Sequence, residues 1–454
     1  PPCRKNHSVL KCGKNEKDFP MDQYKKLLHS LDLREKKPLA LYIHIPFCAR
    51  KCAYCDFLSF PSDEEKMRAY MEQLRKELLF RSVKPSGIES ESQPLLESPY
   101  EIISVFFGGG TPSFVPFSEI VKTMELIQAH FPVAKEAEIT IECNPSSTMK
   151  LALLAYKRAG FNRISFGLQS ANDEELKFLG RTHRYFDFLK AYEDARLSGF
   201  TNINVDLMNG IPLQSAKSFQ RSLKSISMLR PEHLSIYNLI VENGTRFFRM
   251  HKEGVLPLPT EEALLEMDRL SLLWTRKMGM ERYEISNFAK EGFASIHNYN
   301  YWSDVPYLGL GLGASSYFQK TRWKNVNSLV KYMEIPFAEE DKIFKVDVPS
   351  SENAQSASKF LCTESQSIEN LLTEEKHSLS KEEQMEEFFF LGLRRTEGVS
   401  ETDFVARFSV DIHKLYGEIL SRLVEEGYLI HKNARYYFTP EGLDLSNQLL
   451  VRFL

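Results

Sequence analysis

Short apolar runs alternate with longer amphipathic segments from Leu39 to about Met278. The runs have the length of strands and the longer segments the period of helices, which is typical of repeated β-α units around a parallel sheet. The strand candidates are Leu39 to Ile45, Ile102 to Phe107, Glu138 to Cys143, Arg163 to Gly167, Asn202 to Leu207 and His233 to Leu239. The pattern therefore predicts an α/β fold with six β-α units.

The clearest helical period lies between the first two strand candidates, over Glu64 to Phe80. Its apolar residues recur every three or four positions: Met67, Tyr70, Leu74 and Leu78. Ser62 and Glu65 have the spacing of a capping box, so the helix is expected to begin there.

Three cysteines follow the first strand candidate with the spacing Cys48-x3-Cys52-x2-Cys55. Closed zinc sites use four protein ligands and closed ferredoxin clusters four thiolates, and no fourth cysteine is near. The spacing favours an iron–sulfur cluster held on three irons, with the fourth iron open to an exchangeable ligand. The alternative is three free cysteines packed as small apolar side chains in a turn.

The cysteine motif, with Tyr54 before its third cysteine, resembles the signature of the radical S-adenosylmethionine (SAM) superfamily. The resemblance implies a partial (β/α)6 barrel with a [4Fe–4S] cluster on Cys48, Cys52 and Cys55. In that family the amino and carboxylate groups of SAM chelate the open iron. Electron transfer from the cluster then cleaves SAM to a deoxyadenosyl radical.

Further chemically suggestive residues follow the later strand candidates, where parallel α/β folds place their ligand sites. Glycines 108 to 110 allow a close backbone approach to a ligand, although a glycine run also serves a plain tight turn. Glu142 alone equally fits a solvated acid at a strand end. Arginine offers a fork for a carboxylate, and aspartate an acceptor for ribose hydroxyls. The expected SAM-binding residues are Tyr42, Phe57, Gly109, Gly110, Thr111, Glu142, Gln169, Arg181 and Asp206.

More narrowly, the chain resembles oxygen-independent coproporphyrinogen III dehydrogenases and the related HemW-type heme chaperones. The match covers roughly Leu39 to Tyr317 and resumes in the C-terminal part. Two features favour the chaperones. The dehydrogenases usually carry a fourth cysteine where this chain has Phe57, and His297 to Trp302 reads HNxxYW, a motif characteristic of the chaperones.

The resemblance implies a heme chaperone that binds heme and delivers it to apo-hemoproteins while carrying a cluster and SAM. Imidazole is a common axial ligand of heme iron, and aromatic rings can stack on a porphyrin. The candidate heme contacts are therefore His297, Asn298, Tyr301 and Trp302. The alternative for His297 is a hydrogen-bonded loop histidine beside core aromatics. The alternative function is the dehydrogenase, a radical oxidative decarboxylation of propionates in heme biosynthesis, and no catalytic residue is assigned.

The expected organisation is an N-terminal extension (1–37), a barrel with the heme motif (38–317), a connecting segment (318–380) and a C-terminal domain (381–454). Val346 to Ser380 holds eight serines and is expected to be a flexible insertion. The C-terminal part predicts a Ser400/Asp403 helix cap, a helix from about Ile412 to Glu426 and a hairpin turn at Lys432 to Arg435, a winged-helix-like α+β arrangement. Its nine basic and thirteen acidic residues argue against DNA.

Composition limits the partners. A net charge of −3 gives no footprint for nucleic acid. Seven cysteines in 454 residues fit a reducing compartment, and no apolar stretch approaches the length of a membrane span. We therefore expect a cytoplasmic protein with at most peripheral membrane contact, possibly a homodimer.

Overall fold

The computed structural model describes residues 22–83, 94–338 and 367–454. Six parallel strands form the centre of one twelve-stranded sheet, in the spatial order β1 to β6. All six predicted strands are confirmed. Their bounds are β1 Lys37–Ile45, β2 Tyr100–Gly109, β3 Val133–Cys143, β4 Arg163–Gln169, β5 Asn202–Asn209 and β6 His233–Asn238.

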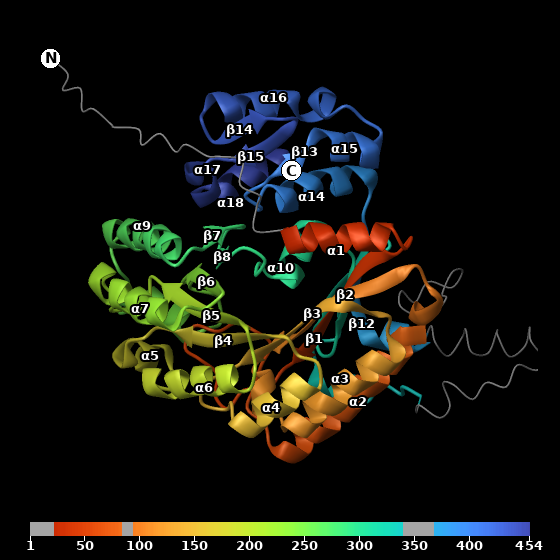
Figure 1. The fold of residues 1–454 in the computed structure, drawn as a ribbon, viewed down its shortest axis with the longest axis vertical. Helices are drawn as coiled ribbons and strands as arrows, with labels where there is room; N and C mark the ends of the chain where they lie inside the picture. Colours follow the sequence, from red (N-terminus) through yellow and green to blue (C-terminus); the bar gives the residue numbers. More distant parts are fainter. Residues whose placement is uncertain (1–21, 84–93, 339–366) are drawn as a thin grey trace, which may run out of the picture.

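Helices follow the strands and cover the outer face of the curved sheet (Figure 1). They are α2 Glu64–Val83, α3 Phe117–His130, α4 Lys150–Arg158, α5 Asp173–Leu179, α6 Tyr185–Leu197, α7 Ala216–Leu229, α8 Arg246–Lys252 and α9 Glu261–Lys277. The predicted capping box of α2 is wrong. The Asp63 carboxylate accepts the Lys66 N–H at 2.9 Å, because Asp63 directly precedes the first helical residue.

The six strands have one apolar and one polar face. Ile139, Ile141 and Cys143 of β3 belong to the main apolar core. Glu138, Thr140 and Glu142 alternate with them and point to the other side, as strand geometry requires. The same alternation continues on β4 and β5, so the barrel interior is lined with polar side chains. These alternating strands differ from the all-apolar strands that are usual in parallel sheets.

Further strands extend both edges of the sheet. Beyond β1 lie β9 Tyr307–Leu310, β10 Ser315–Phe318, β11 Thr321–Asn325 and β12 Thr373–Ser378; beyond β6 lie β8 Asn287–Ala289 and β7 Glu281–Arg282. Short helix α11, Leu329–Met333, follows β11. The end of the predicted serine-rich linker is therefore a strand of the main sheet, paired with β11. Residues 346–366 of that stretch lie outside the described part of the chain.

Two helices close the barrel on the side away from the cysteines. Helix α10, Ile296–Trp302, contains the HNxxYW motif and contacts β2. Helix α1, Asp22–Asp32, comes from the predicted N-terminal extension, and its Tyr24 packs edge-on against Tyr299 of α10. Figure 1 shows α1 and α10 between the barrel and the C-terminal part.

The C-terminal part has its own apolar core around Phe389 and Phe404. Its helices are α14 Lys381–Gly392, α15 Glu401–Phe408, α16 Ile412–Glu425, α17 Pro440–Asp444 and α18 Ser446–Leu450; its sheet has β13 Val399–Ser400, β14 Leu429–Lys432 and β15 Arg435–Phe438. Ser400 caps α15 by accepting the Asp403 N–H, so the predicted cap and hairpin are confirmed. None of the helices described here is long and apolar enough to cross a membrane.

Candidate functional site

The cysteine loop leaves the carboxyl end of β1 and is fixed by one backbone hydrogen bond within itself and by bonds to two other segments. The Cys48 N–H donates to the Phe60 carbonyl at 3.1 Å, which closes the loop on itself. The Ala53 N–H donates to Leu179 O at the end of α5 at 2.9 Å, and Phe247 N at the start of α8 donates to Ala53 O at 3.0 Å. The loop is therefore held in place by the barrel scaffold.

All three cysteines of the loop are partly exposed free thiols that line one pocket. Cys48 Sγ lies 3.5 Å from the Thr111 hydroxyl, and an Arg181 guanidinium nitrogen lies 3.6 Å from Cys52 Sγ. Burial raises the pKa of the Cys55 thiol to about 11. No three His, Cys, Asp or Glu side chains in the described ranges are arranged to hold a single metal ion. A [4Fe–4S] cluster makes no such demand, because each thiolate binds a different iron.

The glycine run at the carboxyl end of β2 lies tightly against the end of β1 and the start of the cysteine loop. Gly109 has a φ of +111°, and a Cβ there would lie 2.6 Å from the His44 ring. A Cβ on Gly110 would lie 2.7 Å from the Phe47 carbonyl oxygen. Both positions therefore require glycine, and the run exposes backbone groups to the pocket. Thr111 comes next and also lines the pocket.

Two carboxyl groups, Glu142 on β3 and Asp206 on β5, face the same pocket. Strand register brings them together, because Glu142 pairs with Ser165 and Asp206 with Gly167 on the strand between. The Gly109 N–H donates to Glu142 Oε2 at 3.2 Å. Burial, with the nearby Asp206 carboxylate, raises the pKa of Glu142 to about 8, and burial also raises the pKa of Asp206. At neutral pH the site therefore carries less negative charge than two free carboxylates.

Arg181 supplies one of the positive charges of the pocket, which Arg50 and Lys51 also line. One of its terminal nitrogens donates to the Gly167 carbonyl at 2.6 Å, while its buried Nε has no hydrogen-bond partner in the described structure. Gln169, at the end of β4, has a φ of +71°, an uncommon value for a residue with a side chain. Strained backbone of this kind is enriched at ligand sites.

The structure brings most of the predicted site residues into this pocket. Those that line it are Cys48, Cys52, Cys55, Phe57, Gly109, Gly110, Thr111, Glu142, Gln169, Arg181 and Asp206. Tyr42 lines an adjoining cavity that shares Phe57, Gly109 and Glu142 with the pocket. The four candidate heme residues of α10 line neither of these cavities.

The residues present fit the two groups that the cysteine motif implies. Three accessible thiols supply the donor set for a cluster on three irons. The unpartnered Arg181 Nε and the glycine surface of the same pocket fit a ligand with a carboxylate and an amine. These residues would hold the cluster and SAM within one pocket.

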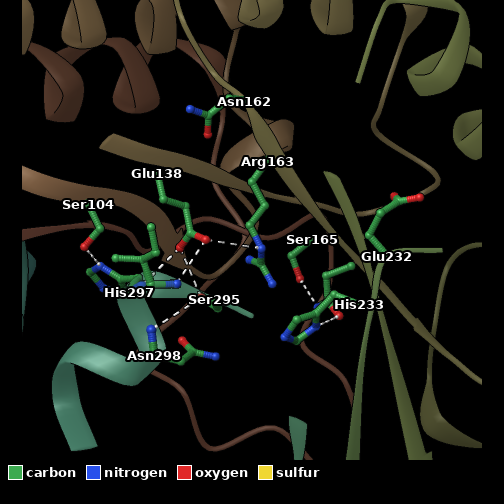
Figure 2. Close-up of polar contacts among 12 residues, drawn as sticks. Ser104, Glu138, Asn162, Arg163, Ser165, Glu232, His233, Ser295, His297 and Asn298 are labelled. Atoms are coloured by element: carbon green, nitrogen blue, oxygen red, sulfur yellow. Dashed lines mark hydrogen bonds and ion pairs between the residues drawn. The ribbon is translucent and has the colours of Figure 1, made fainter. Parts of the chain in front are cut away.

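Figure 2 shows the buried polar network behind the pocket, where α10 meets the strands. The Glu138 carboxylate caps α10 by accepting the Ser295 hydroxyl and the N–H groups of Ile296 and His297, each at 3.1 Å. The Arg163 Nε lies 3.8 Å from Glu138 Oε2. The capped helix is thereby anchored inside the barrel.

His297 is buried, with 1% of its surface exposed. Its Nδ1 lies 2.9 Å from the Ser104 hydroxyl and its Nε2 lies 3.0 Å from the Tyr301 hydroxyl. Burial lowers the pKa of this imidazole to about 3, so the ring is neutral at physiological pH. Neither nitrogen is available to a metal in this arrangement.

Trp302, the last residue of the motif, also contacts other parts of the protein. The Trp302 indole N–H donates to Glu284 Oε2 at 3.1 Å, and the Arg394 guanidinium lies over its ring at 5.3 Å. Tyr283, which follows β7, and Thr396, which follows α14, meet through a backbone hydrogen bond in which the Thr396 N–H donates to the Tyr283 carbonyl at 3.1 Å. Segments far apart in the sequence therefore converge around α10.

Sequence reasoning missed several polar residues of the two cavities. Ser165, Asn144 and Thr182 line the cluster pocket, and Lys324 and Asn327 line the adjoining cavity. A signal for Ser165 exists in the alternation Arg163, Ser165, Gly167 along β4. For Lys324 the signal is the alternation Arg322, Trp323, Lys324 along β11, in which two basic residues flank a tryptophan.

Residues 42–226 match a family model described as Radical SAM superfamily, and residues 379–445 match one described as HemN C-terminal domain. A Bacillus subtilis protein named heme chaperone HemW is 34% identical over 414 residues, covering 91% of this chain and 98% of its own length. A mouse protein named radical S-adenosyl methionine domain-containing protein 1, mitochondrial, is 36% identical over 282 residues, covering 62% of this chain and 60% of its own.

Among solved structures, the coproporphyrinogen III oxidase HemN from Escherichia coli has a similar fold. The TM-score is 0.72 at 20% sequence identity, covering 94% of this chain and 93% of that chain. At this identity the likeness concerns the fold alone, and it confirms the predicted barrel architecture.

Proposed function

This chain belongs to the radical SAM superfamily and to the family whose bacterial members are named heme chaperone HemW, and on that premise we propose that it binds heme and delivers it to apo-hemoproteins. The observation that carries the proposal is the extent of the relationship, which spans 98% of the Bacillus subtilis protein, C-terminal domain included. The position two after Cys55 supports it as well. This position holds Phe57, which is 63% exposed at the pocket rim, in place of the fourth cysteine that the dehydrogenases usually carry.

We further propose that Cys48, Cys52 and Cys55 hold a [4Fe–4S] cluster and that the rest of the pocket holds SAM. The cluster, when bound, supplies a site for electron transfer to SAM. Arg181 would pair the SAM carboxylate, the glycine run would hold its amine, and Asp206 would accept from its ribose hydroxyls. The raised pKa of Glu142 keeps its carboxyl group mostly protonated at neutral pH, so this group would be a hydrogen-bond donor in the pocket.

The HNxxYW helix has a different role in this proposal from axial ligation of heme. Both His297 nitrogens are engaged within the protein, and Glu138 fixes the helix start. We propose that α10 closes the barrel and joins it to the C-terminal domain. The Arg395 side chain, which donates to the Ser303 hydroxyl at 3.2 Å, is part of that joint.

For the domains, we propose that the barrel unit extends through β12 to Ser378 and includes α1. We propose that residues 381–454 form a separate domain, which the apolar cluster of their own supports. The partners we propose are heme and apo-hemoprotein clients in a reducing compartment. The vertebrate relatives are named mitochondrial. Imaging of the tagged full chain would distinguish localisation to mitochondria from localisation to the cytoplasm.

Heme transfer tests the function directly. Protein loaded with one equivalent of hemin is mixed with an affinity-tagged apo-hemoprotein, and the heme recovered with the tagged acceptor is measured over time. The proposal expects this transfer to be faster than spontaneous heme release, which capture by excess apomyoglobin measures. Conversion of coproporphyrinogen III to a vinyl product by the reduced, SAM-loaded protein would instead establish the dehydrogenase.

A further inference from the structure

A cavity of about 380 Å³ opens beside the cluster pocket. Three residues, Phe57, Gly109 and Glu142, belong to the walls of both spaces. The remaining lining comes from the strand end at Tyr42 and His44, the loop at Asp56 and Leu58, and the edge extension at Gly313, Lys324 and Asn327. A molecule bound in this cavity would therefore lie next to the cluster loop.

Lys324 is the positive group of this cavity. It lies in β11 and is partly buried. The side chains of its buried strand neighbours, Trp323 and Asn325, point to the opposite face of the sheet. In the described part of the chain the Lys324 ammonium group has no hydrogen bond, ion pair or ring contact. Arg322, two residues earlier, differs, because its guanidinium binds Glu387 at 2.8 and 2.9 Å. An unpartnered ammonium in a cavity wall is a ready anchor for a ligand acid.

Three carboxyl groups are close enough to consider as competitors. Asp56 and Glu142 line the cavity, and Glu375 lies opposite Lys324 on β12. None of them forms an ion pair with Lys324 in the described structure. Asp56 and Glu375 are exposed to water, and burial keeps Glu142 mostly protonated at neutral pH. The Lys324 charge is therefore left for a ligand.

Phe57 gives the cavity an apolar face. Its ring is 63% exposed at the junction between the cavity and the cluster pocket. Exposure of a large aromatic side chain at a pocket rim is characteristic of a contact surface for a ligand. A flat apolar ligand with an acidic edge would satisfy both Phe57 and Lys324.

We propose that this cavity receives the propionate edge of heme, with Lys324 Nζ pairing a carboxylate and Phe57 packing against the macrocycle. The inference rests on the proposed heme-binding function and locates the ligand within it. It places heme beside the cluster loop, whereas α10 stays closed in the barrel. Only the acidic edge needs to enter the cavity, and the rest of the macrocycle would extend past Phe57 at its rim.

The test is a double-mutant-type cycle that removes the Lys324 ammonium group, the two carboxylates of hemin, or both. Hemin and hemin dimethyl ester, which lacks the two carboxylates, are each titrated into the full chain and into Lys324→Ala, with the Soret band as readout. Loss of one charge-assisted hydrogen bond is expected to weaken hemin binding about tenfold. The ester is expected to bind both proteins equally. Lys324→Arg, which keeps the charge, should retain most of the hemin affinity.

Lys376→Ala is the matched control. Lys376 is an exposed lysine of β12 that pairs with Trp323, so its side chain lies on the opposite face of the sheet from Lys324. Its removal should leave both titrations unchanged. Circular dichroism melting of each variant checks that the fold is intact.

The outcomes separate the inference from the function. Saturable hemin binding to the wild type, with equal effects of Lys324→Ala on hemin and ester or with no effect, overturns the cavity assignment and leaves the heme-binding function standing. Absence of saturable hemin binding to the wild type overturns the proposed function and the inference together. A selective loss for hemin supports both.

Discussion

The imidazole of His297 stacks on the ring of Phe106, with ring centroids 4.9 Å apart and ring planes inclined by 23°. Tyr42 lies at the edge of the same group, 6.3 Å from His297, and its hydroxyl lies 3.1 Å from His44 Nδ1. The His44 ring in turn faces Gly109. The family motif thus connects to the cluster pocket through a line of packed rings.

Replacing His297 by alanine is expected to leave hemin affinity within about threefold of wild type, since neither nitrogen is free for iron. The same change removes a buried ring and two hydrogen bonds, so the free energy of unfolding should fall by about 3 kcal/mol. Hemin titration and urea denaturation of the same sample measure the two effects. Loss of hemin binding in a folded variant would show that the histidine is a ligand after all.

Cys55 is predicted to be unreactive in the cluster-free protein at pH 7. Burial raises its pKa to about 11, and the thiolate is the reactive form, so alkylation should accelerate as the pH rises toward that value. Iodoacetamide labelling followed by peptide mass spectrometry measures it, with the urea-unfolded chain as the control. Equal rates for the native and unfolded chains at pH 7 would contradict the burial argument.

Gly110→Ala should disrupt the glycine surface, because the new Cβ would lie 2.7 Å from the backbone oxygen of Phe47. A loss of about 2 to 4 kcal/mol in unfolding free energy is expected, with lower iron content after reconstitution. Gly417→Ala in α16 is the matched control. The nearest atom to its Cβ would be 3.6 Å away, and helix propensity predicts a gain of about 0.5 to 1 kcal/mol. Similar destabilisation by both changes would argue against a special role for Gly110.

Glu142→Gln should change how stability depends on pH. Because the folded pKa of about 8 lies above the unfolded value of 4.5, the wild type binds this proton more tightly when folded. Its contribution to stability is present below pH 4.5 and is lost as the pH rises to 8. Water at the open side of the pocket reduces the effect, so a loss on the order of 2 kcal/mol is expected.

The amide introduced by Glu142→Gln cannot ionise, so this variant should lack that loss between pH 4.5 and 8. Denaturant titrations at pH 5 and pH 8.5 compare it with the wild type and with Glu418→Gln, which changes an exposed carboxyl of α16. Parallel pH curves for Glu142→Gln and the wild type would refute the raised pKa.

Arg181→Lys is expected to weaken SAM binding about tenfold or more while the cluster still assembles. Lysine keeps the charge but cannot contact Gly167 O, Cys52 and a carboxylate through one planar group. Equilibrium dialysis with labelled SAM gives the affinity and iron analysis gives the cluster, with the exposed Arg158→Lys of α4 as the control. Unchanged SAM affinity in Arg181→Lys would remove it from the proposed site.

Much of the fold and of the cluster pocket is predictable from the sequence, because both depend on local patterns. The apolar runs of β1 to β6 face packed helices and therefore stand out, and site residues follow strand ends in parallel folds. The predicted α2 cap lies one residue early because Ser62 and Asp63 are both capping residues. Position alone does not tell which one the chain uses.

The parts that the sequence does not predict depend on long-range pairing. Strand β12 is polar on its exposed positions and pairs with β11 across a gap of about fifty residues, so its composition is also that of a linker. Helix α10 has seven residues, and the groups that anchor it lie on distant strands. From the sequence alone His297 resembles a metal ligand. Its two hydrogen-bond partners are Ser104 and Tyr301, and Ser104 lies almost two hundred residues away in the sequence, so the pairing shows only in the fold.

The most direct test of the central claim is a hemin titration of anaerobically reconstituted protein, followed at the Soret band and repeated with Cys48, Cys52 and Cys55 all changed to alanine. We predict saturable binding of one hemin per chain in both proteins, since the heme and cluster sites use different residues. Absence of saturable binding in the wild type would contradict the chaperone function and favour the coproporphyrinogen enzyme.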